Sequence, residues 1–406
     1  MKALVLCGGI PQAALIKELK SRGIYTLLAD MNPNVIARQY ADEFFPISVL
    51  DYEAVKKLAV DEKVDMVLTA CADQVLLVQA HVSEELSLPC YISYETAKNV
   101  SNKELMKQHF INNGIPTSKY FVMEQLDEEK IKELRYPLVV KPVDAYSSRG
   151  VRKVFNICEL RDAFIDALEI SRTRTAIIEE FVAGEEITID VYVEDGMAHV
   201  LCISSIDKLP DNDKFIICRT RYPAQISDAV KEKIATISNQ IAEAFGLKNS
   251  PMLVQMITDG DNVSVVEFCA RTGGGDKFRL IKQASNFDVI KAVVDLTMGQ
   301  KPHVVPYQLS KHIINEFLYV KPGIFDHIEN FEEMKKQGII DEYFQLKPKG
   351  FNCLNVNSSS ARIAYYTIIT STIDDARKID RIVSDKIKII DNRGEDILRH
   401  DYICSF

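Results

Sequence analysis

The first hundred residues alternate between short apolar runs and amphipathic segments, and this alternation limits the folds open to the chain. Each apolar run has the length of a buried strand, and each amphipathic segment has the spacing of a helix. In chain order we expect strand 2–7, helix 11–22, strand 24–29, helix 52–61 and strand 64–69. Strands that alternate with helices form a parallel sheet. The sequence therefore predicts an α/β fold with a Rossmann-like domain at its start.

The ligand-binding edge of such a sheet lies at the carboxyl ends of its strands. Asp73 follows the third strand and lies on that edge. Asp30 ends the second strand and suits a dinucleotide, but the turn at Gly8 and Gly9 lacks the full GxGxxG pattern. We therefore expect a scaffold or a substrate-side domain, with dinucleotide binding as the weaker alternative.

Residues 136–154 add a second constraint, because two strand-like runs enclose a polar loop. Residues 138–140 are apolar, Lys141 follows them directly, and the chain returns through 151–155. The loop at 144–150 contains two serines, an arginine and a glycine. Backbone N–H groups, hydroxyls and a guanidinium of this kind can surround a polyphosphate. The alternative is a solvated hairpin with a lysine on its surface.

Composition argues against several classes of protein. The formal net charge of −9 argues against a nucleic-acid-binding or membrane-surface protein. The nine cysteines are scattered and form no CxxC pair, which is typical of reduced thiols in the cytoplasm. No apolar stretch reaches the roughly 18 residues of a membrane span, and the apolar start is too short for a signal peptide. We therefore expect a cytoplasmic protein that contacts neither nucleic acid nor membrane.

Two further segments each have a nucleotide-binding and an ordinary interpretation. A helix capped by Ser101 carries Lys103 and Lys107 one turn apart, and two such lysines more often form a solvated basic face. A later strand pauses at 180–182, where unpaired backbone N–H and C=O groups could meet a purine edge. Glu186 follows at a spacing that suits the ribose hydroxyls. The ordinary alternative for this second segment is an acidic loop.

Polar side chains also gather on later strands. Arg219 and Arg221 share one face of a strand, a placement that suits contact with anions. Gln255 and Glu267 lie on two strands joined by a tight turn, and Arg271 lies just beyond them. Oxygen ligands of this kind suit Mg²⁺, which takes one or two protein ligands together with substrate phosphates. The absence of GxxxxGK[ST] and HExxH motifs argues against P-loop and zinc enzymes.

The last part of the chain has a pattern of its own. From about residue 312 we expect a separate α+β lobe. Its strongest elements are a strand at 361–370, a helix at 373–383 and a strand at 387–390.

The order of these segments resembles that of the ATP-grasp superfamily over roughly residues 1–310. The segment FCARTGGGDKFRL resembles bacterial L-amino acid ligases and the carbamoyl-phosphate synthetase large subunit, and KPKGFNCLNVNSSSARIAYYTIIT resembles the former. The resemblance implies an ATP-grasp fold that is α/β overall, with α+β character in the lid and the C-terminal lobe. The implied domains are a Rossmann-like domain at 1–98, an ATP-grasp domain at 99–311 with a lid at about 117–183, and a C-terminal lobe at 312–406.

The resemblance also implies a role for each matching residue. The residues expected to contact the nucleotide are Lys103, Lys141, Ser147, Ser148, Gly150, Glu180, Val182 and Glu186. The expected metal ligands are Gln255, Glu267 and Cys269, and the expected catalytic residues are Arg271, Lys141 and Arg149. The sequence departs from the family pattern at Cys269, where Asn is usual, and at Ala145 and Tyr146, where glycines are common.

The activity implied is that of an ATP-dependent carboxylate–amine ligase. The γ-phosphoryl group of ATP would pass to a carboxylate, and an amine would then attack the acyl phosphate. The implied cofactors are ATP with Mg²⁺, or Mn²⁺, the partners are a small carboxylate and a small amine, and a homodimer is one expected assembly. Two alternatives stay open: a carbamoyl-phosphate-synthetase-like or carboxylating enzyme that uses bicarbonate, and a non-catalytic ATP-binding module.

Overall fold

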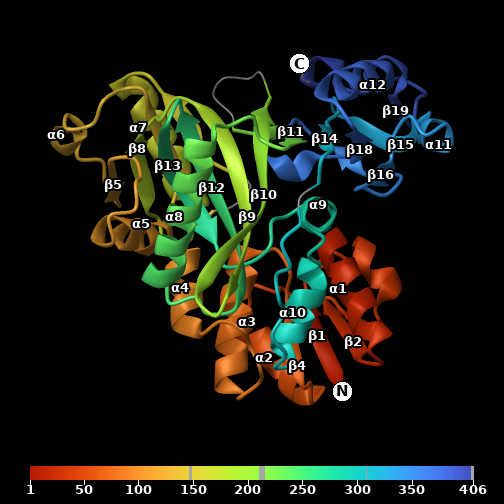
Figure 1. Ribbon diagram of the computed structural model, residues 1–406, viewed down its shortest axis with the longest axis horizontal. Helices are drawn as coiled ribbons and strands as arrows, with labels where there is room; N and C mark the ends of the chain where they lie inside the picture. Colours follow the sequence, from red (N-terminus) through yellow and green to blue (C-terminus); the bar gives the residue numbers. More distant parts are fainter. Residues whose placement is uncertain (146–148, 210–214, 308, 404–406) are drawn as a thin grey trace.

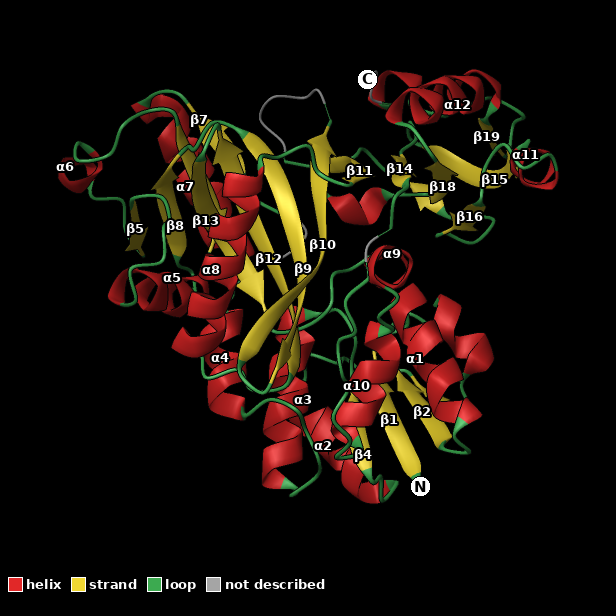
Figure 2. Cartoon of the chain, viewed as in Figure 1, coloured by secondary structure: helices red, strands yellow, loops and turns green. Residues whose placement is uncertain are grey.

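The computed structural model describes residues 1–145, 149–209, 215–307 and 309–403. The described strands form four sheets, which Figures 1 and 2 show as separate groups of arrows with helices packed between and around them. Ser147 and Ser148 lie outside the described residues. No helix among the described residues combines the length and the apolar character needed to cross a membrane.

The N-terminal sheet has the strand order β3-β2-β1-β4, and each of its strand pairs is parallel. Its elements are β1 (Lys2–Leu6), α1 (Ile10–Ser21), β2 (Tyr25–Ala29), η1 (Ile36–Tyr40), β3 (Glu43–Phe45), α2 (Tyr52–Asp61), β4 (Met66–Leu68) and α3 (Asp73–Glu85). The parallel pairing confirms the Rossmann-like start of the chain. A distant helix, α10 (Val289–Thr297), packs its apolar face on α1 in the same core, and Figure 1 shows the two helices side by side.

A second sheet, the lid sheet (residues 120–180), has the antiparallel order β5-β8-β6-β7. Its elements are β5 (Tyr120–Met123), α6 (Glu128–Ile131), β6 (Leu138–Pro142), β7 (Arg152–Val154), α7 (Ile157–Ile170) and β8 (Ala176–Glu180). Helix α7 begins where the Asn156 side chain accepts a hydrogen bond from the Glu159 N–H, while the Glu159 carboxylate accepts one from the Phe155 N–H. This reciprocal capping supplies partners for N–H groups that a helix start leaves free.

The largest sheet has eight antiparallel strands in the order β13-β12-β9-β10-β11-β14-β18-β16. The strands are β9 (Glu185–Glu194), β10 (Met197–Lys208), β11 (Ile217–Tyr222), β12 (Ser250–Asp259), β13 (Asn262–Cys269), β14 (His312–Leu318), β16 (Glu342–Gln345) and β18 (Ala364–Thr370). One face carries the helices α4 (Tyr94–Ser101), α5 (Lys103–Asn112) and α8 (Asp228–Ala244), whose apolar residues join those of β9 and β12 in one core. Because β14 pairs with β11, this sheet runs on into the C-terminal residues.

The remaining C-terminal elements form a smaller layer beside that sheet. They are β15 (Gly323–Glu329), α11 (Phe331–Lys336), β17 (Asn352–Cys353), η2 (Ser359–Ala361), α12 (Ile373–Lys386), β19 (Lys388–Asp391) and η3 (His400–Tyr402). The predicted helix at 373–383 and strand at 387–390 are present, whereas the strand expected from 361 begins at Ala364. The start is displaced because residues 359–361 form a 3₁₀ turn.

Two expectations about the start of α5 need correction. Ser101 ends α4, and the Asn102 side chain caps α5 by accepting hydrogen bonds from the N–H groups of Glu104 and Leu105. The expectation that both lysines lie on a solvated basic face is also wrong for one of them, since Lys107 is only 1% exposed.

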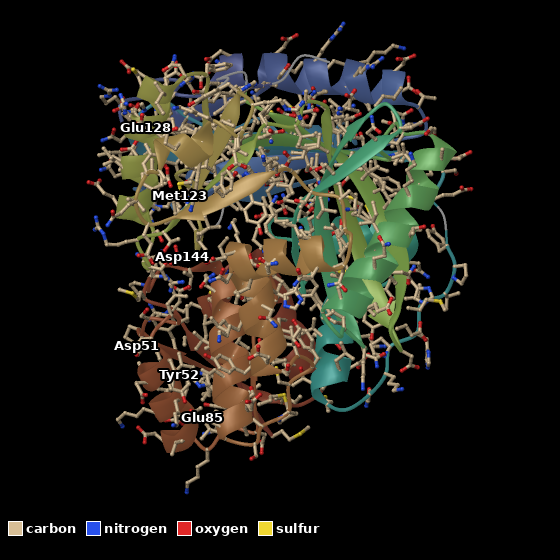
Figure 3. The ribbon with its side chains drawn as sticks, turned by 90° about the vertical axis from the view of Figure 1, so that its left-hand side faces the viewer. Asp51, Tyr52, Glu85, Met123, Glu128 and Asp144 are labelled. Carbon is tan, nitrogen blue, oxygen red and sulfur yellow. The ribbon has the colours of Figure 1, made fainter. Side chains whose placement is uncertain are left out.

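The lid sheet contacts the N-terminal domain directly. In Figure 3 Asp144 lies between Met123 of the lid sheet and Asp51 of the N-terminal domain. The Asp144 carboxylate accepts a hydrogen bond from the Arg172 N–H at 3.1 Å, and the Arg172 guanidinium donates to the Gln74 side chain on α3. These contacts hold the end of the lid hairpin over the N-terminal sheet.

Candidate active site

One large cavity of about 1250 Å³ lies where the N-terminal domain, the lid sheet and the eight-stranded sheet meet. Its walls include Asp73 from the first part, Lys141 from the second and Glu267 from the third. The predicted site residues that line it are Lys103, Lys141, Arg149, Glu180, Val182, Glu186, Gln255, Glu267, Cys269 and Arg271. Gly150 lies instead against the lid core, with φ +74, and a Cβ there would approach the Ile170 side chain to 2.7 Å.

A buried carboxylate between two lysines forms one wall of the cavity. Glu179 Oε1 lies 2.5 Å from Lys141 Nζ, and its Oε2 lies 2.8 Å from Lys107 Nζ. The Ser118 hydroxyl donates to Oε2 at 2.9 Å, and Lys107 donates to both Thr117 and Ser118. Each side chain of the trio is at most 8% exposed. The trio fixes the Lys141 ammonium at the end of β6.

The protonation of this trio follows from burial and mutual charge. Burial alone raises the pKa of Glu179, but the Lys107 and Lys141 ammonium groups outweigh it and hold that pKa well below its usual value. Burial alone lowers the pKa of Lys141, but the Glu179 and Glu267 carboxylates outweigh it and raise that pKa. Burial lowers the pKa of Lys107, and the Lys141 charge adds to the effect. Glu179 is therefore ionised and Lys141 cationic near neutral pH.

We expect Glu179→Gln to destabilise the protein at neutral pH and to lose this effect in acid. A carboxylate whose folded pKa is depressed contributes stability above its unfolded pKa of about 4.3, and this contribution disappears as the pH falls toward the folded pKa. The difference in free energy of unfolding between wild type and variant should therefore shrink below about pH 4, as measured by urea unfolding. Glu133→Gln, at a 60% exposed side chain, serves as the control. A wild-type-to-Glu179→Gln difference that stays constant into acid would contradict the assignment.

A second group of polar side chains lines the cavity from β12 and β13. Gln255 and Glu267 are direct partners in the antiparallel register, so both project from the same face into the cavity. Lys103 Nζ lies 3.7 Å from Glu267 Oε2 and donates to the Ala145 carbonyl at 2.8 Å. An amide and a carboxylate oxygen side by side fit the preferences of a magnesium ion that is completed by phosphate oxygens and water.

Cys269 and Arg271 both contact Asp73, the residue expected at the ligand edge of the N-terminal sheet. Arg271 Nε donates to Asp73 Oδ1 at 2.7 Å, Nη2 pairs with Oδ2, and Nη1 donates to the Thr272 carbonyl. The Cys269 thiol forms a hydrogen bond with the same carboxylate. Burial raises the pKa of the Cys269 thiol well above its usual value. A protonated, buried thiol is a poor ligand for a hard cation. The chemistry of the donors therefore fits Gln255 and Glu267 better than Cys269.

The segment around Glu180 shows which backbone groups are free to meet a ligand. Glu180 N donates to the Lys119 carbonyl and Phe181 N to the Pro137 carbonyl. Within the described part of the chain no group accepts a hydrogen bond from the Val182 N–H. The Glu180 side chain turns away to pair with Arg135, at 3.1 Å, and Glu186 pairs with Lys208. The Val182 N–H is thus the free hydrogen-bond donor that the pause in the strand predicts.

The two arginines on β11 meet anions, but these anions belong to the protein. Arg219 Nε lies 2.5 Å from Glu316 Oε2, and Nη2 lies 2.7 Å from Asp380 Oδ2. Arg221 Nη2 lies 2.9 Å from Asp207 Oδ1. Sequence reasoning also missed the buried pair of Lys107 and Glu179, although the spacing of Lys103 and Lys107 by one helical turn already placed both lysines on one face.

Comparison with known proteins agrees with this geometry. A family model described as an ATP-grasp domain matches residues 134–278. The chain is 27% identical over 273 residues to 3-methyl-D-ornithine–L-lysine ligase of Methanosarcina barkeri, covering 67% of each chain. It is 21% identical over 317 residues to the carbamoyl phosphate synthase large chain of Clostridium acetobutylicum, where the match covers 76% of this chain and only 29% of the relative.

A solved structure extends the similarity to almost the whole fold. The L-amino acid ligase of Bacillus licheniformis superimposes with a TM-score of 0.81 at 22% identity, covering 96% of this chain and 98% of that one. The family match covers the lid hairpin, Glu179 and the Gln255–Glu267 pair, which are the parts of the cavity described above. The chain therefore carries an ATP-grasp domain at residues 134–278 and shares its overall fold with that ligase structure.

Proposed function

We propose that the protein is an ATP-dependent carboxylate–amine ligase that acts through an acyl phosphate. The observation that carries the proposal is the convergence of Lys141, Glu267 and Arg271 on one cavity from separate parts of the chain. Cations for phosphate groups and oxygen ligands for a metal line the same cavity, which is the combination that phosphoryl transfer requires. The similarity to ligases that join amino acids supports the same chemistry.

The nucleotide would lie between the lid sheet and the eight-stranded sheet. Lys103 and Lys141 would contact its phosphates, and the loop with Ser147, Ser148, Arg149 and Gly150 would cover the outer phosphate. The Glu180 carbonyl and the free Val182 N–H offer the acceptor and donor that an adenine edge needs. Glu186 would turn from Lys208 toward the ribose hydroxyls.

Gln255 and Glu267 would hold the metal ion, Mg²⁺ or Mn²⁺, which when bound would reduce the negative charge of the phosphate groups. Lys141 would neutralise charge on the phosphates through its Nζ. Arg271 would aim its guanidinium at the acid, because Asp73 fixes the orientation of that group. Cys269 would support Asp73 through its hydrogen bond rather than bind the metal. Closure of the lid sheet would keep water from the acyl phosphate.

A screen for ADP formation tests the proposal. With MgATP, a carboxylic acid and an amine, ADP should appear only when both substrates are present. Turnover that needs bicarbonate in place of the acid would support the carboxylating alternative, while nucleotide binding without turnover on any pair would support the non-catalytic one. The predicted homodimer and cytoplasmic location stay predictions, which light scattering and cell fractionation would test.

We expect Lys141→Ala to weaken MgATP binding by about 10- to 100-fold. A charge-assisted hydrogen bond contributes about 1.5–3 kcal/mol, and each 1.4 kcal/mol is a factor of ten in Kd. Calorimetry with a non-hydrolysable ATP analogue measures the change. Lys132→Ala, at a lid position with a 69% exposed side chain, should bind like wild type. An unchanged Kd in a folded Lys141→Ala protein would remove Lys141 from the nucleotide site.

A further inference from the structure

One buried glutamine connects the lid to the N-terminal side of the cavity. Gln74 is the second residue of α3, lines the cavity and is 9% exposed. Its side-chain oxygen accepts a hydrogen bond from the guanidinium of Arg172, which follows α7 in the lid. Its Nε2 donates to the Ser101 carbonyl at 2.9 Å. The two ends of the amide are therefore used by two different parts of the chain, the lid and the segment that leads into α5.

Arg172 is anchored within the lid by a carboxylate. Asp144 Oδ2 accepts a hydrogen bond from the Arg172 N–H at 3.1 Å and lies 3.4 Å from Arg172 Nε. The Asp144 side chain is 10% exposed and comes just after β6, the strand that carries Lys141. Figure 3 shows Asp144 at the junction of the lid with the N-terminal domain. The guanidinium therefore bridges the end of the lid hairpin and the start of α3.

On the other side, Gln74 is adjacent to the residue that orients Arg271. Asp73 precedes Gln74 in α3, and its backbone carbonyl accepts a hydrogen bond from the Ser101 hydroxyl at 3.1 Å. The Asp73 carboxylate pairs with Arg271 through two hydrogen bonds. Ser101 thus contacts Gln74 through its carbonyl and Asp73 through its hydroxyl. These contacts fix the positions of Gln74 and Asp73 together.

A second contact with the lid hairpin would not persist when nucleotide binds. Lys103 Nζ donates to the Ala145 carbonyl at 2.8 Å, but as a ligand of the nucleotide phosphates this ammonium group would leave the carbonyl. Arg172 lies outside the lining of the cavity, so a bound nucleotide does not compete for its guanidinium. The hydrogen bond between Arg172 and Gln74 is therefore the contact that can hold the lid while the site is filled.

We propose that Arg172 and Gln74 form a latch that ties the lid to the Asp73 side of the cavity, with Gln74 as a positioning residue for the pair of Asp73 and Arg271. The latch slows the release of nucleotide and limits the entry of water while Arg271 faces the acid. The inference rests on the proposed ligase function and deepens it. It assigns the link between the two ends of the site to residues that take no part in the chemistry.

The rate of nucleotide release tests the latch without the ligase reaction. A fluorescent, non-hydrolysable ATP analogue is bound with Mg²⁺ and then displaced by an excess of the unlabelled analogue. Arg172→Met should release it about 5-fold faster, as expected for the loss of one charged hydrogen bond at a side chain that is 55% exposed. Gln74→Leu should do the same. Because both variants break one contact, the double variant should be no faster than either single variant.

Three further variants separate the latch from a general loss of stability. Arg161→Met removes a lid arginine of similar exposure, 52%, whose ion-pair partner also belongs to the lid. Gln79→Leu removes a buried amide of α3 that forms its hydrogen bonds within the N-terminal domain. Both should release the analogue at the wild-type rate. Gln74→Glu keeps an oxygen that accepts a hydrogen bond from Arg172, so its release rate should return close to that of wild type.

The ratio of ADP to amide measures the entry of water during turnover, with the acid and amine that give most ADP in the screen. Water would attack the carbon of the acyl phosphate and break the C–O bond to phosphate. Phosphate would leave with that electron pair and one proton, the other proton would pass to solvent, and the acid would be regenerated. Arg172→Met and Gln74→Leu should therefore both form more ADP per amide than wild type. Gln74→Leu should also lower kcat more than Arg172→Met, which keeps the contact with Ser101.

The outcomes distinguish the latch from the ligase function. Release rates and ADP-to-amide ratios that are unchanged in both Arg172→Met and Gln74→Leu overturn the latch and leave the ligase function standing. An equal acceleration of release by Arg161→Met also overturns the latch. A wild type that binds the analogue but forms no ADP with any acid and amine overturns the ligase function, and the release rates then still decide whether the latch exists.

Discussion

Glu267→Gln is expected to lower the rate of ADP formation by roughly 10³-fold. Glu267 is the carboxylate of the proposed metal pair, and its register partner Gln255 is neutral. Stabilisation of transition-state charge by a bound metal ion contributes several kcal/mol, and each 1.4 kcal/mol is a factor of ten in rate. The variant keeps the size of the side chain and removes only its charge. The loss should therefore appear in kcat and in the Mg²⁺ concentration that gives half-maximal activity.

Glu104→Gln is the matched control for this variant. Glu104 is exposed in the first turn of α5, next to Lys103. Its substitution therefore changes the charge near the site without altering the two proposed metal ligands. The control should behave as wild type. A folded Glu267→Gln protein with near wild-type turnover and an unchanged Mg²⁺ requirement would place the metal elsewhere.

The parts of the fold that depend on residues close together in the sequence could be predicted from the sequence. Strands β1, β2 and β4 and helices α1 and α2 follow from apolar periods that repeat within each segment, whereas the short strand β3 was not predicted. The lid hairpin was predictable for the same reason, since β6 and β7 pair across a short loop. Helix α9 (Lys277–Ser285) was not predicted, although its four buried residues follow a helical spacing.

The charged groups of the site could not be predicted in the same way, because their partners are distant in the chain. Arg271 and Asp73 are separated by 198 residues. The ion pair of Lys107 and Glu179 joins helix α5 to strand β8 of the lid sheet. Only an ion pair of this kind allows a lysine side chain to be buried to 1% exposure. A sequence shows that such side chains carry charge, but the fold decides whether they meet a ligand or each other. Arg219 is the clearest example.

Arg219→Met is expected to destabilise the protein by about 3–5 kcal/mol, the usual cost of breaking a buried ion pair by removing one partner. The Arg219 side chain is 1% exposed, that of Glu316 is 0% exposed and that of Asp380 is 4% exposed. The variant would leave both carboxylates inside the protein without their shared cation. Tyr366 would still donate to Asp380 at 2.8 Å, which satisfies one oxygen but supplies no charge. Urea unfolding at neutral pH measures the change.

The neighbouring arginine on β11 provides the comparison that isolates burial. Arg221 pairs with Asp207 at 2.9 Å, but both side chains are about a quarter exposed. Water screens such a pair, so Arg221→Met should cost about 1 kcal/mol or less. A triple variant that combines Arg219→Met with Glu316→Gln and Asp380→Asn should recover much of the lost stability, because no carboxylate is then left buried without a cation. If Arg219→Met and Arg221→Met cost the same, or if the triple variant is no more stable than Arg219→Met, burial of the paired charges does not determine the stability of this junction between the eight-stranded sheet and α12.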